Sequence, residues 1–448
     1  MKRRQRLRTK FLGRTFCFPA EPLVSRLSFL TRLRAVPSGL LIVAAAVTLS
    51  AAFAVDPVRD AATLGAVSEV TLRRPMSYLL LAPVSNVLDT MTLMSVRQHV
   101  VFLLTVIVAY GVWWWRVGRA SLASAMPARR ALREIARVGV GLVLLLGLYA
   151  GVTIIPRPMA ALEASTDILV IDFHAHTRFS HDGRPDWTPE DVRAWHRNAG
   201  FDVAYITDHR TFEGARDGWA NNPPRAGEGT FLLPAIEVVW RGEHVNVLDA
   251  DRMYRGLLNE TLRDIDERAL SLASVLAGAE PVIIETIPGD ISKVVPATGR
   301  GTAGVRAIEI VDGSPRGLGQ TRRERARIVQ LADSTNLALV AGSDHHGWGH
   351  TAAGWTLLFL PQWRAVSPDQ LSTAISNSLR NGGRRSTRVV ERYVADTETG
   401  VALFLSVPLV AWGMLRALSG DERIVWLAWS LAIYLAWRAV NARRRERE

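Results

Sequence analysis

The chain has 448 residues, of which 48 % are hydrophobic, and it carries a formal net charge of +12. This length is too great for one ordinary domain. The positive charge lies mainly in 1–35, 116–137 and 438–448, which hold ten, six and five Lys or Arg residues and flank apolar segments. Basic residues in such places set orientation in a membrane and meet anionic lipid head groups, so charge alone does not predict nucleic-acid binding. The single cysteine, Cys17, excludes an intrachain disulfide and a Cys-rich metal site.

Apolar segments early in the chain are candidates to cross a membrane. Three of them contain no Asp, Glu, Lys or Arg, namely 35–55, 99–115 and 138–155. Each is close to the roughly 20 residues that a transmembrane helix needs. The alternative, buried helices of a soluble core, is less favoured because core helices usually keep a polar face. A further apolar segment, 76–95, contains Pro83, Asn86 and Asp89, which favour an interfacial or re-entrant position over another span.

The basic loops predict the orientation of the chain. Positively charged short loops stay on the cytoplasmic side, which places the N-terminal arm and loop 116–137 inside and the region that begins near Pro156 outside. We therefore expect that region on the extracytoplasmic (periplasmic) side of a bacterial-type inner (plasma) membrane. The tail, 396–448, is predicted to form a hydrophobic hairpin with a basic end. Its second segment, 424–437, has only 14 residues and is rich in Trp, so an interfacial position is the alternative.

Between the membrane regions 1–159 and 396–448, residues 160–395 alternate short apolar runs with stretches of helical character, such as 188–199 and 321–335. This alternation predicts an α/β domain with a largely parallel sheet, open or closed into a barrel. The apolar runs that predict strands are 168–173, 201–206, 231–239, 244–248, 281–287, 305–311 and 337–341.

Polar residues gather where these predicted strands end. In parallel α/β sheets the carboxyl ends of the strands share one edge, and catalytic groups collect there. Nine of the ten histidines in the chain fall between residues 174 and 350. Four strands would deliver His and carboxylate side chains to that edge: His174 and His176, then Asp208 and His209, then Glu237, then Asp344, His345 and His346.

The spacing of His174 and His176 suits a metal ion. Alternate residues of a strand point to the same side, so the two imidazoles can bind one ion. Mixed His and carboxylate ligands suit zinc, manganese or iron rather than a metal that prefers thiolates. A carboxylate such as Glu237 can bridge two ions, and paired ions are a common device for phosphoester hydrolysis.

Four ordered motifs resemble those of a known family. HAHTRFSHDG, ITDHR, PAIEV and GSDHH are similar to the successive motifs of the PHP (polymerase and histidinol phosphatase) superfamily, over roughly half of the chain. Members are metal-dependent phosphoesterases with a distorted seven-stranded β/α barrel, which would here be inserted between transmembrane helices. The resemblance implies two to three divalent ions (Mn, Zn or Fe), with Glu237 bridging. The implied metal ligands are His174, His176, Asp182, His209, Glu237, His244, Asp344 and His346.

The chain departs from the family pattern at one position. The family usually has a His-Pro pair after a later strand, where this chain has Ile287-Pro288. Because isoleucine offers no lone pair, the third ion is expected to be weak or absent, and we predict two firmly held ions. Glu285 would replace the missing ligand only if the strand places it on the same side as Ile287.

Other polar residues have predicted roles beside the metal. Arg178 is a candidate catalytic residue that would hold a substrate phosphate by bidentate hydrogen bonds, with a solvated loop residue as the alternative. His345 and His181 are candidates for acid–base work or for support of the ligands. Asp208 is expected to orient its neighbour. His196, on a predicted helix, is expected to lie at the surface.

The functional prediction is a membrane-anchored, metal-dependent hydrolase of phosphate mono- or diesters. Its expected partners are the lipid bilayer and a phosphorylated small molecule or cell-envelope substrate. The alternative is a PHP-like domain that has lost turnover and binds a ligand or partner at the membrane, with Ile287 as the mark of decay.

Overall fold

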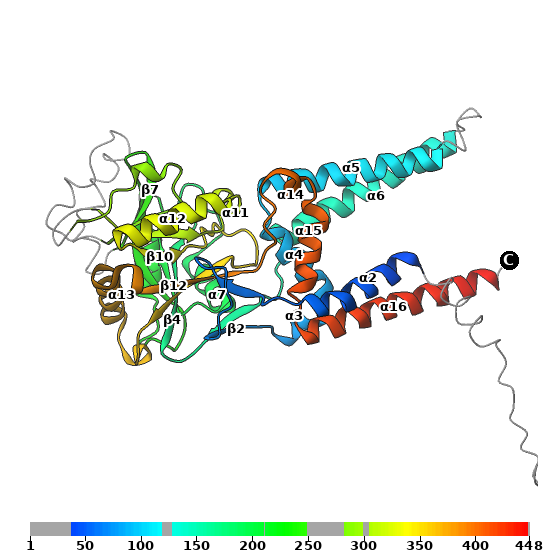
Figure 1. Ribbon diagram of the computed structural model, residues 1–448. Helices are drawn as coiled ribbons and strands as arrows, with labels where there is room; N and C mark the ends of the chain where they lie inside the picture. The colour runs from blue at the N-terminus through cyan, green and yellow to red at the C-terminus, as the bar shows by residue number, and fades with distance from the viewer. Residues whose placement is uncertain (1–36, 119–127, 210, 249–281, 299–303, 447–448) are drawn as a thin grey trace, which may run out of the picture. The chain divides into compact units, whose positions relative to one another are not determined.

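The structure, a computed structural model (Figure 1), describes residues 37–118, 128–209, 211–248, 282–298 and 304–446. The chain divides into two compact units. The larger is Val47–Trp426, and the smaller combines Met1–Ala46 with Leu427–Glu448. Cys17 lies outside the described residues.

One sheet dominates the larger unit. Its strands follow the order β1-β12-β11-β4-β5-β6-β7-β8-β9-β10. Their bounds are β1 Val58–Asp60, β4 Ile168–Ala175, β5 Val203–Ile206, β6 Phe231–Trp240, β7 Glu243–Leu248, β8 Val282–Glu285, β9 Val305–Val311, β10 Ala338–Ala341, β11 Gly354–Phe359 and β12 Thr387–Arg392. Two further strands, β2 Val70–Arg73 and β3 Ala161–Ala164, form a separate antiparallel pair.

The seven apolar runs that predict strands all form strands, β4 to β10, so this part of the prediction is confirmed. The predicted seven-stranded barrel is wrong in strand number, because β1, β11 and β12 join the same sheet to make ten. The sheet is also mixed rather than largely parallel, since β6, β7 and β8 run antiparallel to their neighbours in turn and β11 reverses between β4 and β12. One reversal is a two-residue turn at Arg241 and Gly242, both with positive φ, which is the geometry of tight hairpins.

The sheet curls into a half-barrel. Strand β10 ends the hydrogen-bonded order, yet its backbone is bonded to side chains of strands near the other end. Ala341 N donates to Thr356 Oγ1 at 2.7 Å. Thr387 Oγ1 donates to the carbonyl of Leu339 at 2.6 Å. These two bonds bring the carboxyl end of β10 beside β11 and β12.

Side chains alternate along the strands, so the two faces of the sheet bury different residues. One face, with Phe173, packs against helix α13 (Pro368–Gly382). The other face, with Ala204, packs against α7 (Pro189–Ala199) and α12 (Arg322–Thr335). Both α7 and α12 are among the predicted helices, and each begins with a capping box that fixes its first turn.

Three helices are long and apolar enough to cross a membrane. They are Val96–Arg116 within α5 (Val96–Gly118), Glu134–Thr153 within α6 (Ala128–Thr153) and Gly420–Arg444 within α16 (Gly420–Arg445). The first two overlap the spans predicted at 99–115 and 138–155. The remaining helices are α2 Ser38–Ser50, α3 Met76–Leu80, α4 Ala82–Thr92, α8 Glu213–Ala220, α11 Pro315–Leu318, α14 Gly400–Phe404 and α15 Ser406–Arg416, with short 3₁₀ turns at Ala51–Phe53, Ile291–Lys293, Trp363–Ala365 and Gly383–Arg385.

Two expectations about the apolar segments change. The first predicted span is a shorter apolar helix, Ser38–Phe53. The 14-residue tail segment belongs to the 26-residue helix α16, which continues through polar residues at both ends. As expected, 76–95 is not a span among the described residues, because α3 and α4 break at Leu81.

Asp89 of α4 ties this helical region to the sheet within the larger unit. The carboxylate is 2 % exposed. It accepts hydrogen bonds from Arg157, from Arg392 at 2.7 Å, from Tyr78 at 2.9 Å and from Thr351 at 2.8 Å. Burial alone would raise the pKa of Asp89, but the two guanidinium groups outweigh it and lower the pKa. The polar residue that argues against a span therefore serves as an anchor between α4, β12 and the loop after β10.

Removal of this anchor should be costly. Asp89→Ala is expected to lower the free energy of unfolding by about 3–5 kcal/mol, because it leaves two largely buried guanidinium groups without their counter-charge. The measurement is the midpoint of thermal unfolding of the full-length protein in detergent. Asp333→Ala is the matched control, since Asp333 pairs with Arg384 at the surface, where such pairs contribute little. Equal midpoints for the two variants would contradict the prediction.

Candidate metal centre

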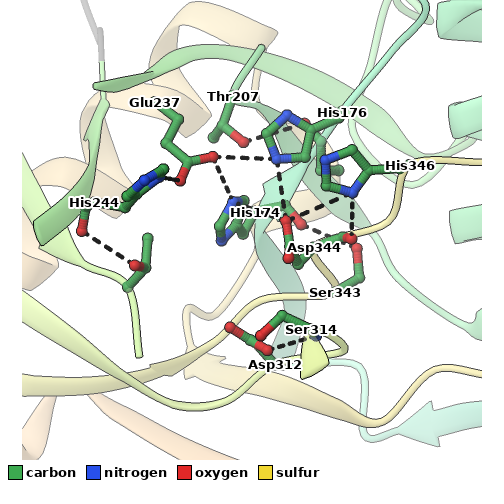
Figure 2. Close-up of polar contacts among 12 residues, drawn as sticks. His174, His176, Thr207, Glu237, His244, Asp312, Ser314, Ser343, Asp344 and His346 are labelled. Carbon is green, nitrogen blue, oxygen red and sulfur yellow. Dashed lines mark hydrogen bonds and ion pairs between the residues drawn. The ribbon is translucent and has the colours of Figure 1, made fainter. Parts of the chain in front are cut away.

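The predicted ligands come from separate strands and meet at one edge of the sheet. His174 lies in β4, Glu237 in β6 and His244 in β7, while Asp344 follows β10. Figure 2 shows the side chains of His174, His176 and His244 turned toward Glu237. The residues form three groups, and within each group the ligand atoms lie within 4.8 Å of one another. The groups are His174, His176, Glu237 and Asp344; His176, Asp182 and His209; and His209, Glu237 and His244.

Each pair of groups has one residue in common. The first and second share His176, the second and third share His209, and the first and third share Glu237. The three groups therefore form one continuous cluster rather than three isolated ones. Glu237 is suited to a bridging position, because its Oε2 lies 2.9 Å from His174 Nε2 while its Oε1 lies 2.5 Å from His244 Nδ1.

The eighth predicted ligand, His346, lies beside the second group. Its Nε2 is 3.1 Å from Oδ2 of Asp182, and its ring stacks on His176 with 4.1 Å between ring centroids. Its Nδ1 is 2.8 Å from the carbonyl oxygen of Asp344. A proton on Nδ1 would leave Nε2, the nitrogen near Asp182, as the one with a lone pair to offer.

The geometry around His176 fits a metal ion. His176 is fully buried, and its Nε2 lies 3.2 Å from Oε2 of Glu237 and 3.2 Å from Oδ1 of Asp344. Neither contact has the alignment of a hydrogen bond, so both ring nitrogens lack a hydrogen-bond partner among the described residues. Buried polar groups are rarely left in this state. Ligand atoms that converge without bonding to one another are arranged as they would be around a cation.

The backbone at Asp344 is held in a strained conformation. Its φ is 47°, in the left-handed region that few residues other than Gly, Asn and Asp adopt. Asp344 N donates to the carbonyl of His174 at 2.8 Å, and Ser343 Oγ donates to the same oxygen at 3.0 Å. A side chain at Gly342 would meet His174 Cβ at 2.5 Å. The chain after β10 is therefore packed directly against β4, which places Asp344 among the ligands.

Carboxylates behind the cluster orient the histidines. Glu309, fully buried in β9, has its Oε1 3.1 Å from Nδ1 of His174. A proton held there leaves Nε2 of His174 as the ligand nitrogen; ligand histidines in metal sites usually donate their other ring N–H to a carboxylate in this way. Asp208 accepts from the backbone N and the hydroxyl of Thr177, both at 2.6 Å. Asp208 thus braces the turn after β4, and these bonds do not involve its neighbour His209, which it was expected to orient.

His196 is buried, so its predicted surface position is wrong. Its Nε2 lies 2.6 Å from Oδ2 of Asp172, and its Nδ1 bonds to the carbonyl of Val192. Oδ1 of Asp172 in turn accepts from the backbone N of His174 and of Ser343. Helix α7 therefore supports both ligand-bearing segments through this pair. Neither Asp172 nor Glu309 is among the predicted ligands, although each is a carboxylate inside an apolar strand run.

The electrostatics of the cluster reflect the close approach of opposite charges. Burial would lower the pKa of His174 and His176, but the neighbouring carboxylates outweigh it. They raise the pKa of His174 well above its usual value and that of His176 to about 9. Burial likewise opposes ionisation of Glu237 and Asp344, yet the histidines lower the pKa of both carboxylates. Glu309, which lies behind His174, differs from these two carboxylates, because burial dominates and raises its pKa to about 8.

The two predicted catalytic residues lie in different surroundings. Arg178 is exposed, and its guanidinium contacts the ring of Phe179 at 5.1 Å. His345 is buried and stacks on Trp195 at 4.1 Å. Its Nε2 lies 3.2 Å from the carbonyl of Gly349 and its Nδ1 accepts from Gly347 N, so both nitrogens are engaged by its own loop. The structure therefore does not offer His345 as a proton carrier, and His181, 69 % exposed beside His209, is the accessible imidazole.

The third ligand group contains a donor, His209, that was not counted when Ile287 was taken to leave this ion with too few ligands. His209 joins Glu237 and His244, so this group has three ligand atoms without residue 287. His209 also belongs to the second group, and one imidazole nitrogen binds one ion. Glu285, which pairs with Val245 in the sheet, belongs to none of the three groups. Two firmly held ions therefore remain our prediction.

Comparison with known proteins finds distant likenesses. No protein-family model matches the chain, and no curated protein matches it. Among solved structures, PsfC from Pseudomonas syringae is 19 % identical, with 54 % of this chain and 96 % of that chain covered and a TM-score of 0.33. A proposed metal-dependent phosphoesterase from Bifidobacterium adolescentis is 18 % identical, with 45 % and 94 % covered and a TM-score of 0.27. The lesion-specific endonuclease Q from Pyrococcus furiosus is 11 % identical, with 47 % and 56 % covered and a TM-score of 0.32. These values are too low to assign a function, which has to come from the residues of this chain.

Metal content should depend on Asp344. Asp344→Asn is expected to reduce the bound ions from about two per chain to about one or fewer, because it removes a charged ligand of a site that needs at least three. Asparagine tolerates the left-handed backbone, so this substitution separates ligation from strain. The measurement is elemental analysis of the purified full-length protein after dialysis, with Asp333→Asn as the surface control. Unchanged metal content in Asp344→Asn would contradict the ligand assignment, and three ions in the parent would contradict the predicted count.

Metal affinity should rise with pH. A ligand imidazole must be deprotonated to bind, and the pKa of His176 in the metal-free cluster is about 9. Each proton displaced on binding makes the apparent affinity rise by about tenfold per pH unit below that pKa. Titration of the metal-free protein with Mn²⁺ at pH 6.5, 7.5 and 8.5 would check this. An affinity that stays constant over this interval would show that the histidines do not bind the ion.

Proposed function

We propose that the chain is a membrane-anchored, metal-dependent phosphoesterase of the PHP type, which hydrolyses a phosphate mono- or diester. The observation that carries the proposal is the overlap of the ligand groups, with Glu237 common to two of them. Overlapping groups suit ions a few ångströms apart, and paired ions about 3.5–4 Å apart are a common device for in-line displacement at phosphorus.

The residues of the cluster divide the work between them. His174, His176, Asp182, His209, Glu237, His244, Asp344 and His346 would hold the ions. Ions bound there would polarise the phosphoryl oxygens and lower the pKa of an attacking water. Glu309 and Asp172 fix the orientation of ligands on β4 and after β10. Ser180 Oγ donates to Oδ1 of Asp182 at 2.6 Å, which leaves Oδ2 directed at His209 and His346.

Two exposed residues at the rim would meet the substrate. Arg178 makes no side-chain hydrogen bond to another described residue, and its planar guanidinium suits a phosphate oxygen pair. His181 is 69 % exposed, with its ring 4.9 Å from that of His209, and takes the acid–base role first considered for His345. Its position at the rim suits transfer of a proton to the leaving oxygen.

The proposed location follows from the apolar helices and the basic loops. Three helices have the length and composition of membrane spans. The charge rule then places the metal centre on the extracytoplasmic (periplasmic) side of an inner (plasma) membrane. An outward-facing site would act on phosphorylated small molecules or cell-envelope phosphate esters.

Loss of a ligand should abolish turnover. His176→Ala and Asp344→Asn are expected to lower kcat/KM for 4-nitrophenyl phosphate and bis(4-nitrophenyl) phosphate by about 100-fold or more, because each removes a ligand from the cluster. The assay uses the full-length protein in detergent with Mn²⁺, and Asp333→Asn serves as control. Activity of both ligand variants close to that of the parent would sink the proposal.

The side of the membrane can be tested with single cysteines. In a Cys17→Ser background, Asp333→Cys on α12 is expected to react with a membrane-impermeant maleimide in intact spheroplasts. Ser121→Cys, in the basic loop 116–137, is expected to react only after lysis. The reverse pattern would overturn the orientation drawn from loop charge.

A further inference from the structure

A cavity of about 340 Å³ lies at the same edge of the sheet as the metal centre. Its walls include Ile287, Pro288 and Gly289 after β8, and Pro315 and Arg316 after β9. The backbone N of Thr286 donates to the carbonyl of the ligand His244 at 3.1 Å. The cavity wall therefore begins at Ile287, one residue after Thr286, whose backbone is bonded to that of the ligand His244.

The cavity is lined by positive charge. Arg97, Arg316 and Arg327 all contribute to its wall. Arg316 donates to the carbonyl of Ile287 at 3.1 Å and pairs with Glu243, whereas Arg97 and Arg327 make no direct hydrogen bond or ion pair with the described residues. The one acidic residue of the lining, Glu324, accepts at Oε2 from the backbone N and hydroxyl of Thr321, and these bonds, with the charges of Arg97 and Arg327, lower its pKa. Three arginines and one carboxylate give the lining a net positive charge, which favours an anion.

Gln320 also belongs to the wall, but its amide nitrogen is not open to the cavity. Nε2 is buried from solvent without a hydrogen-bond partner among the described residues, and Oε1 accepts from Arg325 at 3.0 Å. The donors that the cavity offers to phosphate oxygens are therefore its arginines.

The remaining wall of the cavity is the beginning of a candidate membrane span. Ser95, Val96 and Arg97 line it, and Val96 is the first residue of the span Val96–Arg116. The other neighbouring span ends close to residues 344–351, the metal loop that follows β10, because Gly349 N donates to the carbonyl of Thr153 at 2.7 Å. The ends of two candidate spans thus lie against the edge of the sheet that carries the ligands.

Apolar side chains are exposed beside the ends of these two candidate spans. Val96 is 58 % exposed and Trp348, in the metal loop, is 50 % exposed. Ile154 and Ile155, which follow the second span, are 51 % and 50 % exposed. A tryptophan and aliphatic residues beside span ends are typical of the membrane interface. A phosphate that reaches the cavity from this side comes from the bilayer surface.

We propose that the cavity binds the phosphate head group of a membrane lipid before it reaches the neighbouring metal centre, so that lipid phosphate esters are the substrate class of that centre. This inference rests on the proposed phosphoesterase function. For a lipid phosphomonoester, one new bond forms between phosphorus and the oxygen of water, and the bond between phosphorus and the lipid oxygen breaks. One proton of that water goes to the lipid alcohol, and inorganic phosphate leaves.

Binding is tested on the metal-free full-length protein, so that it does not depend on turnover. The probe is dioleoyl phosphatidic acid, and its retention in detergent is measured by native mass spectrometry. Retention should fall by about tenfold in Arg97→Ala/Arg327→Ala, as expected from the loss of two phosphate-binding cations. Arg323→Ala, on the same helix as Arg327 but outside the lining, should retain lipid as the parent does. Equal retention by the double variant and the parent would overturn the proposal.

Turnover separates a lipid head group from a free phosphate ester. Phosphatidic acid in nanodiscs is compared with glycerol 3-phosphate, which has the same ester without acyl chains. The lipid is expected to have a kcat/KM at least about tenfold higher, with the ratio reduced in the double variant mainly through KM. No hydrolysis of 4-nitrophenyl phosphate with Mn²⁺ would refute the phosphoesterase function itself. Hydrolysis of that compound without preference for the lipid would refute this inference alone.

Discussion

The hydrogen bond from Asp344 N to the carbonyl of His174 is the junction on which the site depends. It joins β4 to the chain after β10, two segments separated by most of the sheet order, and it requires the curl that brings them together. Gly342 permits this approach, and Asp344 accepts a left-handed backbone to complete it. Because His174, His176 and Asp344 lie at this junction, the contact that closes the half-barrel also brings these three ligands together.

Much of this arrangement could be predicted from the sequence. Buried strands appear as apolar runs, and ligands appear as polar residues where those runs end, because the two signals are local. The partners across the sheet are not local. No residue near His196 in the sequence indicates that Asp172 will contact it. The sequence therefore predicts a surface histidine where the structure has a buried histidine bonded to a carboxylate. Strand β1 was hidden for a similar reason, since its three residues gain their strand character from pairing with β12.

The metal loop 344–351 connects the candidate metal centre to helix α4. At one end it carries Asp344 and His346, and at the other Thr351 bonds to Asp89 of α4. His345 faces away from the ligands and packs against Trp195, so alternate residues of the loop serve different neighbours. The motif GSDHH therefore contains both ligands and packing residues. The motif already separated His346, as a ligand, from His345, and the packing of His345 against Trp195 gives the physical reason for that division.

The sheet begins with residues that precede the candidate spans α5 and α6 in the chain. Strand β1, Val58–Asp60, covers the outer edge of β12, and Asp89 neutralises Arg392 on that strand. A fragment cut at 160–395 would lose both. Its β12 would present a row of unsatisfied backbone groups, the kind of edge that recruits other chains and aggregates. The sheet that carries the candidate metal centre is thus discontinuous in sequence, and expression trials designed around an excised 160–395 fragment would remove one border of that sheet.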